Sequence, residues 1–391
     1  MKKQTETIHS RFQRRDPYGA LSMPVYNTVA YEFPDAASMV ESFCGRSDDP
    51  DYSRVTNPTV IFYERTVRSL TGANDVMAFS SGMAAIANTI MAVSAAGKNI
   101  VTSTHMFGNT YALLTGTLSR FGVETRTVDL TDLDAVRRAI DADTCCVYLE
   151  TITNPQMEVA DLPAISEITR AHGIPLIADT TMIPFTEFSA KSLGVDIEVV
   201  SSTKYISGGA TSIGGLVIDY GTIPGFADRM RKEMLLNFGS YMTPQVAYMQ
   251  TLGLENLHAR YTLQTANARD LAERLRTLPA IKRVNYPGLP DNPYHDITLR
   301  QFGPSFGAML TIDLADADAC FRFLNGLKLV RRATNLFDNR TLAIHPASTI
   351  FGPFNDRQRR EMDILDTTVR ISVGLEDMDD VFDDIKQALE D

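Results

Sequence analysis

The sequence predicts an α/β fold with a large domain on a mostly parallel, seven-stranded sheet, a smaller C-terminal α+β domain and an N-terminal arm. In the middle of the chain, short runs rich in β-branched residues alternate with segments of helical periodicity. These runs are apolar throughout, which is typical of strands buried on both faces of a parallel sheet. The first part of the chain is instead rich in Pro, Gly and Tyr with weak periodicity, which indicates an arm rather than a core.

We expect the arm to span residues 1–56, the large domain residues 57–250 and the C-terminal domain residues 251–391. Such an arm is expected to contact a neighbouring subunit. The strands expected in the large domain are residues 76–79, 99–103, 123–130, 145–150, 175–180, 198–202 and 214–220. The helices expected between them include residues 83–96, 133–142 and 162–172.

Three further elements are expected in the C-terminal domain. Residues 253–278 show the periodicity of one long amphipathic helix. Residues 305–314 form an apolar run that predicts a strand, and residues 378–391 predict a closing helix.

Composition narrows the class of partner. The chain has 391 residues, a net charge of −11 and no cluster of Lys and Arg, so we expect neither nucleic acid nor an anionic membrane as a partner. No apolar run is long enough to span a bilayer, and the basic N-terminus lacks the apolar stretch of a signal peptide, so we expect a cytoplasmic protein. The four cysteines and six histidines show no metal-ligand spacing, so reduced thiols and no metal site are expected.

Small residues follow the strand at 76–79. Ser81, Gly82 and Met83 come where a helix is expected to begin. A helix N-terminus presents free backbone N–H groups and the positive end of the helix dipole, which suits a phosphate. Serine beside glycine is equally ordinary helix capping, so both interpretations stay open at this point.

Two charged side chains follow other strands. Asp179 ends the strand at 175–180 and is either a cap or salt-bridge partner, or a carboxylate facing a cationic ring nitrogen. Lys204 follows the strand at 198–202 and either extends into solvent or, partly desolvated, forms a Schiff base with an aldehyde cofactor.

Taken together, these features predict pyridoxal 5′-phosphate as the cofactor. In an open parallel sheet, ligands bind at the carboxyl ends of the strands. A phosphate cradle, a carboxylate and a lysine at such ends are the parts that this cofactor needs. The hydroxyls of Ser201 and Thr203 are then expected to reach the same phosphate as the amides of Gly82 and Met83.

Seven segments carry a family resemblance almost from end to end. They are YSRVTNPT (Tyr52–Thr59), SSGMAAI (Ser80–Ile86), ETITNPQM (Glu150–Met157), ADTT (Ala178–Thr181), SSTKYISGG (Ser201–Gly209), HPAS (His345–Ser348) and VRISVGLED (Val369–Asp377). In this order they resemble the Cys/Met-metabolism branch of fold-type I PLP-dependent enzymes: cystathionine synthases and lyases, methionine γ-lyases and homoserine-ester sulfhydrylases. The resemblance implies an amino-acid substrate and a homotetramer of dimers that share active sites.

The resemblance also implies roles for individual residues. Lys204 holds the cofactor aldehyde, Asp179 pairs with the pyridinium nitrogen, and Arg370 grips the substrate α-carboxylate together with Asn154. The other implied contacts are Ser81, Gly82, Met83, Phe107, Thr181, Ser201 and Thr203 to the cofactor, Asn335 to the substrate, and Tyr52 and Arg54 reaching the phosphate from a neighbouring subunit. Taken singly, Arg54 and Arg370 also fit surface ion pairs, and Asn154-Pro155 also fits a plain turn.

Phe107 departs from the family pattern, which has tyrosine at this position. The phenyl ring keeps the face that stacks on the cofactor but lacks the phenol that donates a proton. We therefore expect another group to donate any proton that the leaving group needs, with Tyr52 as the first candidate and Tyr111 or Lys204 as alternatives.

The residues around Asn335 bear on the reaction. The shared machinery serves both γ-replacement and γ-elimination, and Asn335 and the basic Arg340 resemble O-acetylhomoserine sulfhydrylases. We therefore expect γ-replacement on an O-acylhomoserine by a sulfur donor, a transferase reaction that gives homocysteine in methionine biosynthesis. A γ-lyase giving 2-oxobutyrate and a cystathionine γ-synthase are the alternatives, and a PLP-binding protein without turnover is a third. Arg340 is expected to favour an anionic sulfur nucleophile, and Phe337, in place of a glycine, to alter the shape of the pocket.

Overall fold

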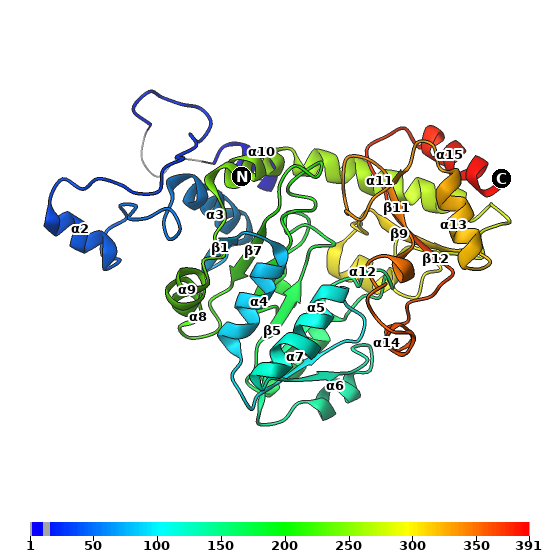
Figure 1. Ribbon diagram of the computed structural model, residues 1–391, viewed down its shortest axis with the longest axis horizontal. Coiled ribbons are helices and arrows are strands. Elements are labelled where there is room, and N and C mark those ends of the chain that lie inside the picture. Colours follow the sequence, from blue (N-terminus) through cyan, green and yellow to red (C-terminus); the bar gives the residue numbers. More distant parts are fainter. Residues whose placement is uncertain (1, 11–15, 391) are drawn as a thin grey trace.

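The computed structural model describes residues 2–10 and 16–390, so residue 1, residues 11–15 of the expected arm and residue 391 lie outside the described residues. Figure 1 shows two bodies side by side, each built on a sheet, with helices α10 (Pro244–Glu255) and α11 (Leu257–Leu275) running across both. The N-terminal arm extends away from the larger body, on the side opposite the C-terminus (Figure 1).

The larger body is built on a seven-stranded sheet in the order β1-β7-β6-β5-β4-β2-β3. Its strands are β1 (Asp75–Phe79), β2 (Asn99–Thr102), β3 (Glu124–Thr127), β4 (Thr144–Glu150), β5 (Leu176–Asp179), β6 (Ile197–Val200) and β7 (Gly215–Asp219). Strand β7 runs antiparallel to both of its neighbours, and the other pairings are parallel. The predicted α/β class and mostly parallel sheet are therefore confirmed.

Both faces of this sheet are covered, as the apolar strands predicted. Alternate residues of one strand enter different hydrophobic clusters: Ile177 of β5 packs on the side of α4 (Gly82–Val93), and Ala178 packs on the side of α7 (Leu162–Ala171). The same alternation holds in β6, where one polar side chain, that of Glu198, is fully buried against a covered face of the sheet.

The remaining helices include α2 (Ala36–Phe43) in the arm, which lies away from both sheets (Figure 1). The others are α1 (Lys3–Ile8), α3 (Pro58–Thr71), α5 (Gly108–Ala112), α6 (Leu133–Ala139), α8 (Phe226–Arg229), α9 (Leu236–Phe238), α12 (His295–Phe302), α13 (Ala317–Gly326), α14 (Asp356–Glu361) and α15 (Met378–Glu390). The expected single helix over 253–278 is instead the end of α10 followed by α11. The break falls at Asn256, whose backbone (φ −107°, ψ 5°) leaves the helical region.

The smaller body is built on a five-stranded sheet in the order β10-β11-β12-β9-β8. Its strands are β8 (Arg283–Asn285), β9 (Met309–Asp313), β10 (Arg331–Arg332), β11 (Leu342–Ile344) and β12 (Thr368–Ser372). Helices α13 and α15 pack against each other beside this sheet. The central strand β12 places Arg370 in the sheet interior, 2% exposed.

The arm is only partly held by its own chain. Near its start, Lys3 Nζ donates to the carbonyl oxygens of Phe185 and Phe188 at 2.8 and 3.0 Å. Farther along, apolar side chains face outward, with Tyr18 96% and Leu21 98% exposed. The limits of the arm and domains at residues 56 and 250 stay predictions. Within the described residues, no helix has the length and apolar character to cross a membrane.

Candidate active site

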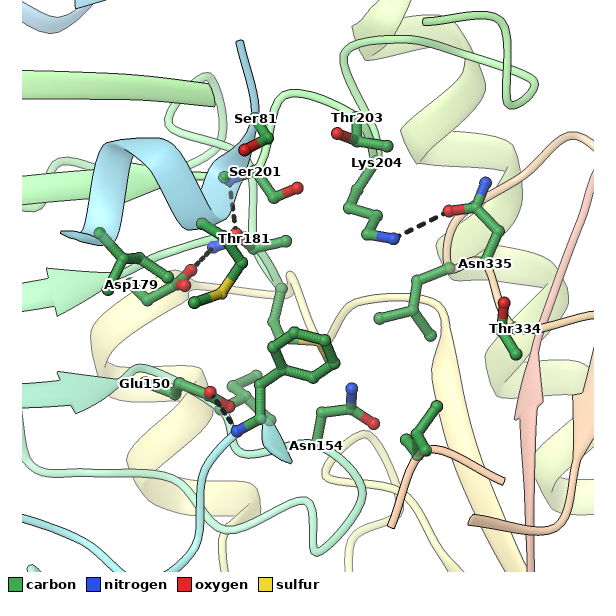
Figure 2. A pocket seen from close by; sticks show the side chains of 18 of the residues that line it. Ser81, Glu150, Asn154, Asp179, Thr181, Ser201, Thr203, Lys204, Thr334 and Asn335 are labelled. Carbon is green, nitrogen blue, oxygen red and sulfur yellow. Dashed lines mark hydrogen bonds between the residues drawn. The ribbon is translucent and has the colours of Figure 1, made fainter. Parts of the chain in front are cut away.

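A cavity of about 400 Å³ lies between the carboxyl ends of the large sheet and the smaller body (Figure 2). Its lining comes from residues far apart in sequence: Ser81, Gly82, Met83, Ile86, Phe107, Glu150, Ile152, Asn154, Asp179, Thr181, Met182, Ser201, Thr203, Lys204, Thr334, Asn335, Leu336, Ile350 and Arg370. The edge of the sheet at which the sequence predicted a ligand is therefore the edge that opens into a cavity.

Lys204 reaches across the cavity toward the smaller body. It follows β6 in the link to β7, and its Nζ donates to Oδ1 of Asn335 at 2.9 Å (Figure 2). Burial, together with the positive charge of Arg370, lowers the pKa of Lys204 to about 8. A substantial fraction of this amine is therefore neutral near physiological pH, as a nucleophilic amine or a proton acceptor must be.

The N-terminus of α4 meets the link after β6 at one end of the cavity. Ser81 caps the helix by accepting from the amide of Ala84 at 3.0 Å, which leaves the amides of the first turn facing outward. A Cβ added at Gly82 would lie 2.7 Å from Cβ of Ser201, so glycine is required for this close approach. Figure 2 shows Ser81, Ser201 and Thr203 gathered at this end.

Two carboxylates stand side by side at the ends of adjacent strands. Glu150 of β4 is paired in register with Asp179 of β5. Asp179 accepts from the amide of Thr181 at 2.9 Å, and Glu150 accepts from the amide of Phe107 at 2.6 Å. Burial raises the pKa of Asp179, and burial together with the charge of Asp179 raises the pKa of Glu150 to about 8. A cation beside Asp179 would relieve this repulsion.

Arg370 lines the cavity from the smaller body. Its Nη1 donates to Oδ1 of Asn154 at 3.1 Å and its Nη2 donates to the carbonyl oxygen of Thr334 at 2.9 Å, whereas its Nε has no hydrogen-bond partner. Burial lowers the pKa of this guanidinium. Among the described residues no carboxylate pairs with it, so a carboxylate from a substrate suits this position.

The cavity brings together twelve of the residues predicted for the site. These are Ser81, Gly82, Met83, Phe107, Asn154, Asp179, Thr181, Ser201, Thr203, Lys204, Asn335 and Arg370. Tyr52 and Arg54 do not line the cavity of their own chain. Tyr52 is 40% exposed, and Arg54 donates to the carbonyl oxygen of Leu236 and lies over the Tyr52 ring, 5.6 Å from its centroid.

Neither Arg340 nor Phe337 forms part of the cavity wall near Asn335, and the position expected for Arg340 was wrong. Arg340 does not line the cavity; it is 64% exposed and pairs with Asp338 at 3.1 Å, so the cation predicted for a sulfur nucleophile lies elsewhere. Phe337 does not line the cavity either: its φ is +55°, and its ring is fully buried and stacks on Tyr205.

Several lining residues were not predicted from the sequence. Glu150 ends a predicted strand as Asp179 does, so the same strand-end argument could have found it. Met182, Leu336 and Ile350 carried no comparable signal, because an apolar residue in a loop is ordinary. No cluster of three or more His, Cys, Asp or Glu side chains able to hold a metal ion occurs within residues 2–10 and 16–390.

Comparisons with known proteins agree with this geometry. The sequence profile of the Cys/Met metabolism PLP-dependent enzymes matches residues 4–390. The chain is 37% identical to an L-methionine gamma-lyase of Fusobacterium nucleatum subsp. polymorphum, over 99% of this chain and 97% of the relative. It is 34% identical to an O-succinylhomoserine sulfhydrylase of Pseudomonas aeruginosa, over 96% of this chain and 93% of the relative.

A solved structure matches the whole fold. It is a Campylobacter jejuni subsp. jejuni protein proposed to be an O-acetylhomoserine (thiol)-lyase, with a TM-score of 0.96, 30% identity and full coverage of both chains. In that crystal structure a lysine carries a pyridoxyl phosphate group. Because similar proteins carry both lyase and sulfhydrylase names, likeness alone does not select between the two reactions.

Proposed function

The chain belongs to the Cys/Met metabolism PLP-dependent enzymes, has the fold-type I architecture and uses pyridoxal 5′-phosphate, and on this basis we propose that it catalyses γ-replacement on an O-acylhomoserine. The incoming group is a small sulfur nucleophile and the product is homocysteine, which places the reaction in methionine biosynthesis.

The cavity fits the cofactor in two structural respects. The close approach at Gly82 leaves a cradle of backbone amides and hydroxyls for a phosphate, and the carboxylate of Asp179 suits a protonated ring nitrogen. When bound, the cofactor supplies an electron sink for the substrate α-carbon. Lys204 then moves protons at the substrate carbons, and Arg370 with Asn154 orients the substrate by its carboxylate.

The observation that carries the choice of leaving group is the phenyl ring of Phe107. No tyrosine lines the cavity among the described residues, so this chain supplies no phenolic acid there. A departing carboxylate needs no protonation, because carboxylic acids have pKa values of about 4. A departing thiolate, with a pKa of about 8.5, gains far more from a general acid. The lining that this chain supplies to its own cavity therefore favours an ester over a thioether as substrate. We assign Tyr52, which we propose below to come from a neighbouring subunit, to the cofactor phosphate.

The remaining wall favours a small nucleophile. Ile152, Met182, Leu336 and Ile350 form apolar surface, and the only lining carboxylates among the described residues are Glu150 and Asp179. Both stand at the ends of the large-sheet strands, on the side assigned to the ring nitrogen. Cysteine as the nucleophile would bring a second ammonium into the site, and the product cystathionine carries two. Because that second ammonium needs a counter-charge, these residues support sulfide or a simple thiol over a cystathionine γ-synthase reaction.

The second candidate function is a γ-lyase acting on methionine or a related thioether. The observation in its favour is the likeness to L-methionine gamma-lyases at 34–37% identity. This reaction would give 2-oxobutyrate and ammonia from the same bound amino acid.

One experiment separates the two. Purified holoenzyme is incubated with O-acetylhomoserine, O-succinylhomoserine or L-methionine, each with and without sulfide, and homocysteine and 2-oxobutyrate are quantified. Sulfide-dependent homocysteine from an ester supports the proposal. Release of 2-oxobutyrate from methionine at a comparable rate without sulfide contradicts it and supports the lyase. No turnover of any substrate supports a binding protein.

We further propose that Tyr52 and Arg54 enter the cavity of a neighbouring subunit in a tetramer of active-site-sharing dimers. The exposed apolar arm and their absence from their own chain's cavity support this. Tyr52→Phe is expected to lower turnover far more than Tyr111→Phe, because Tyr111 packs edge-on against Phe354 outside the cavity lining. Equal, small effects in the two variants would remove Tyr52 from the site, as would a fully active monomer.

A further inference from the structure

Phe337 occupies a backbone conformation that L-residues rarely adopt. Its φ is +55°, in the left-handed region where a Cβ is unfavourable and glycine is preferred, yet the side chain is large and fully buried. Strained conformations of this kind persist only where surrounding contacts hold them. Here the amide of Phe337 donates to Oγ of Ser372 on β12 at 2.7 Å.

The ring of Phe337 stacks face to face on Tyr205. The two centroids lie 3.8 Å apart and the planes differ by 6°. Tyr205 is itself fixed, because its hydroxyl accepts from the amide of Ala308 at 2.9 Å and Tyr261 packs edge-on against it. The stack therefore holds the segment 335–337 in contact with a tyrosine whose own position is fixed.

Two parallel contacts join the same pair of segments. Lys204 and Tyr205 are consecutive residues, and each meets one residue of the segment 335–337: Lys204 Nζ bonds to Asn335, and Tyr205 stacks on Phe337. The second bond of Asn335, from Nδ2 to Asp338, is long at 3.4 Å and holds it only weakly. Arg370 Nη2 also bonds to the carbonyl oxygens of Thr334 and Asn335, at 2.9 and 3.4 Å, and so holds the backbone of this segment. The stack is the contact that ties the segment directly to the residue next to Lys204.

We propose that Phe337 is a positioning residue for Lys204. The Phe337–Tyr205 stack fixes the Asn335 amide beside the amine and so sets the direction in which Lys204 exchanges protons with the substrate. This inference rests on the proposed role of Lys204 but not on the choice between γ-replacement and γ-elimination. Arg370 is held from the large body by Asn154 and meets the segment only through the backbone carbonyls of Thr334 and Asn335, so substrate affinity is expected to depend less on the stack than turnover does.

The test uses variants of the holoenzyme with and without the stack. Phe337→Leu and Tyr205→Leu remove it, and Phe337→Gly removes it while relieving the backbone. Tyr205→Phe keeps both rings. Phe323→Leu is the matched control, because Phe323 of α13 is 1% exposed and does not line the cavity.

The readouts are kcat, KM, the pH titration of the cofactor absorbance and hydrogen exchange over residues 334–338. Loss of the stack is expected to lower kcat roughly tenfold with KM changed less than about twofold. It should also shift the pH titration and speed exchange in this segment, whereas Phe323→Leu keeps kcat and the titration. Tyr205→Phe, which keeps the stack but loses the bond to Ala308, should lower kcat less than Tyr205→Leu does. The double variant Phe337→Leu/Tyr205→Leu should be no worse than either single variant.

The proposal is overturned if Phe337→Leu and Phe337→Gly match Phe323→Leu, with lower thermal stability but unchanged kcat and pH titration. It is also overturned if Phe337→Leu and Phe337→Gly lower kcat but the backbone amides of residues 334–338 exchange hydrogen no faster than in the wild type. Lys204→Ala is measured separately: if it retains the cofactor absorbance of the wild type, the proposed role of Lys204 fails, whatever Phe337 does.

Discussion

Nη1 of Arg370 donates to Oδ1 of Asn154 at 3.1 Å, which joins the central strand of the small sheet to the loop after β4 of the large one. The remaining Nε of this buried guanidinium is unpartnered. The pair therefore forms an anion-binding site made by residues of both bodies. A substrate carboxylate could bind there by two hydrogen bonds.

Replacing Arg370 by lysine is expected to raise KM for the amino-acid substrate roughly 10- to 100-fold, because one charged, bidentate contact is lost. The absorbance of the bound cofactor should change little. Steady-state kinetics on Arg370→Lys, with the exposed Arg340→Lys as the control, checks this. An unchanged KM would remove Arg370 from substrate binding.

The depressed pKa of Lys204 predicts how the cofactor-free enzyme reacts with pyridoxal 5′-phosphate. A lysine with an ordinary pKa of 10.5 is almost wholly protonated at pH 8, whereas Lys204 has a pKa of about 8. Since only the neutral amine attacks an aldehyde, the rate of reconstitution should rise from pH 6 with a midpoint near pH 8 and level off above about pH 9. Stopped-flow absorbance measures it.

Asn335 accepts a hydrogen bond from this amine and so favours its charged form. Asn335→Leu is therefore expected to move the midpoint of that profile to lower pH. A midpoint that moves upward would show that Asn335 does not stabilise the ammonium.

Restoring the phenol tests the leaving-group argument. Phe107→Tyr is expected to raise the rate of elimination from methionine, because a thiolate benefits from a general acid, by about tenfold or more. Its effect on an O-acylhomoserine should stay below about threefold. Comparing the two substrates within one variant cancels differences in folding and cofactor content. If Phe107→Tyr changed the rates with both substrates by the same factor, the residue at position 107 would not discriminate between an ester and a thioether.

His105 links the loop before Phe107 to both bodies. Its two ring nitrogens lie 2.9 Å from Oε2 of Glu158 and 2.9 Å from Oδ2 of Asp363. Burial alone would lower the pKa of His105, but these two carboxylates raise it above the ordinary 6.5, and Asp129 is a further nearby acid.

The raised pKa makes this link dependent on pH. The stabilisation is fully present below about pH 6.5 and is lost as pH rises through the folded-state pKa. His105→Asn should therefore lower the unfolding midpoint by about 2 °C or more at pH 6 and by less at pH 9. Thermal unfolding across this range, with the exposed His172→Asn as control, checks it. A deficit that grows with pH would contradict the charged link.

The positions of Lys204 and Asp179 could be predicted from the sequence because each follows a run that is buried on both faces. The end of such a strand is a defined place in the fold. The meeting of Asn154 and Arg370 could not be derived in this way, because 216 residues separate them and only the resemblance implied it.

Local backbone geometry explains the other differences. At Phe337 the residue type alone suggested a bulkier wall, but the sign of φ decides where the ring goes, and no periodicity reports that sign. At Asn256 the amphipathic pattern continues across the break between α10 and α11, so the pattern predicted one helix. Arg340 is close in sequence to Asn335, but its guanidinium is 64% exposed, pairs with Asp338 and lies outside the cavity lining.

Lys204 lies in the connection between β6 and the antiparallel strand β7. Neighbouring antiparallel strands can be joined by a turn of about two residues, whereas parallel neighbours need a long crossover. The link from Val200 to Gly215 is therefore much longer than its topology requires. The surplus chain holds Ser201, Thr203 and Lys204. The residues that carry the chemistry therefore lie in a connection whose length is not imposed by the order of the strands.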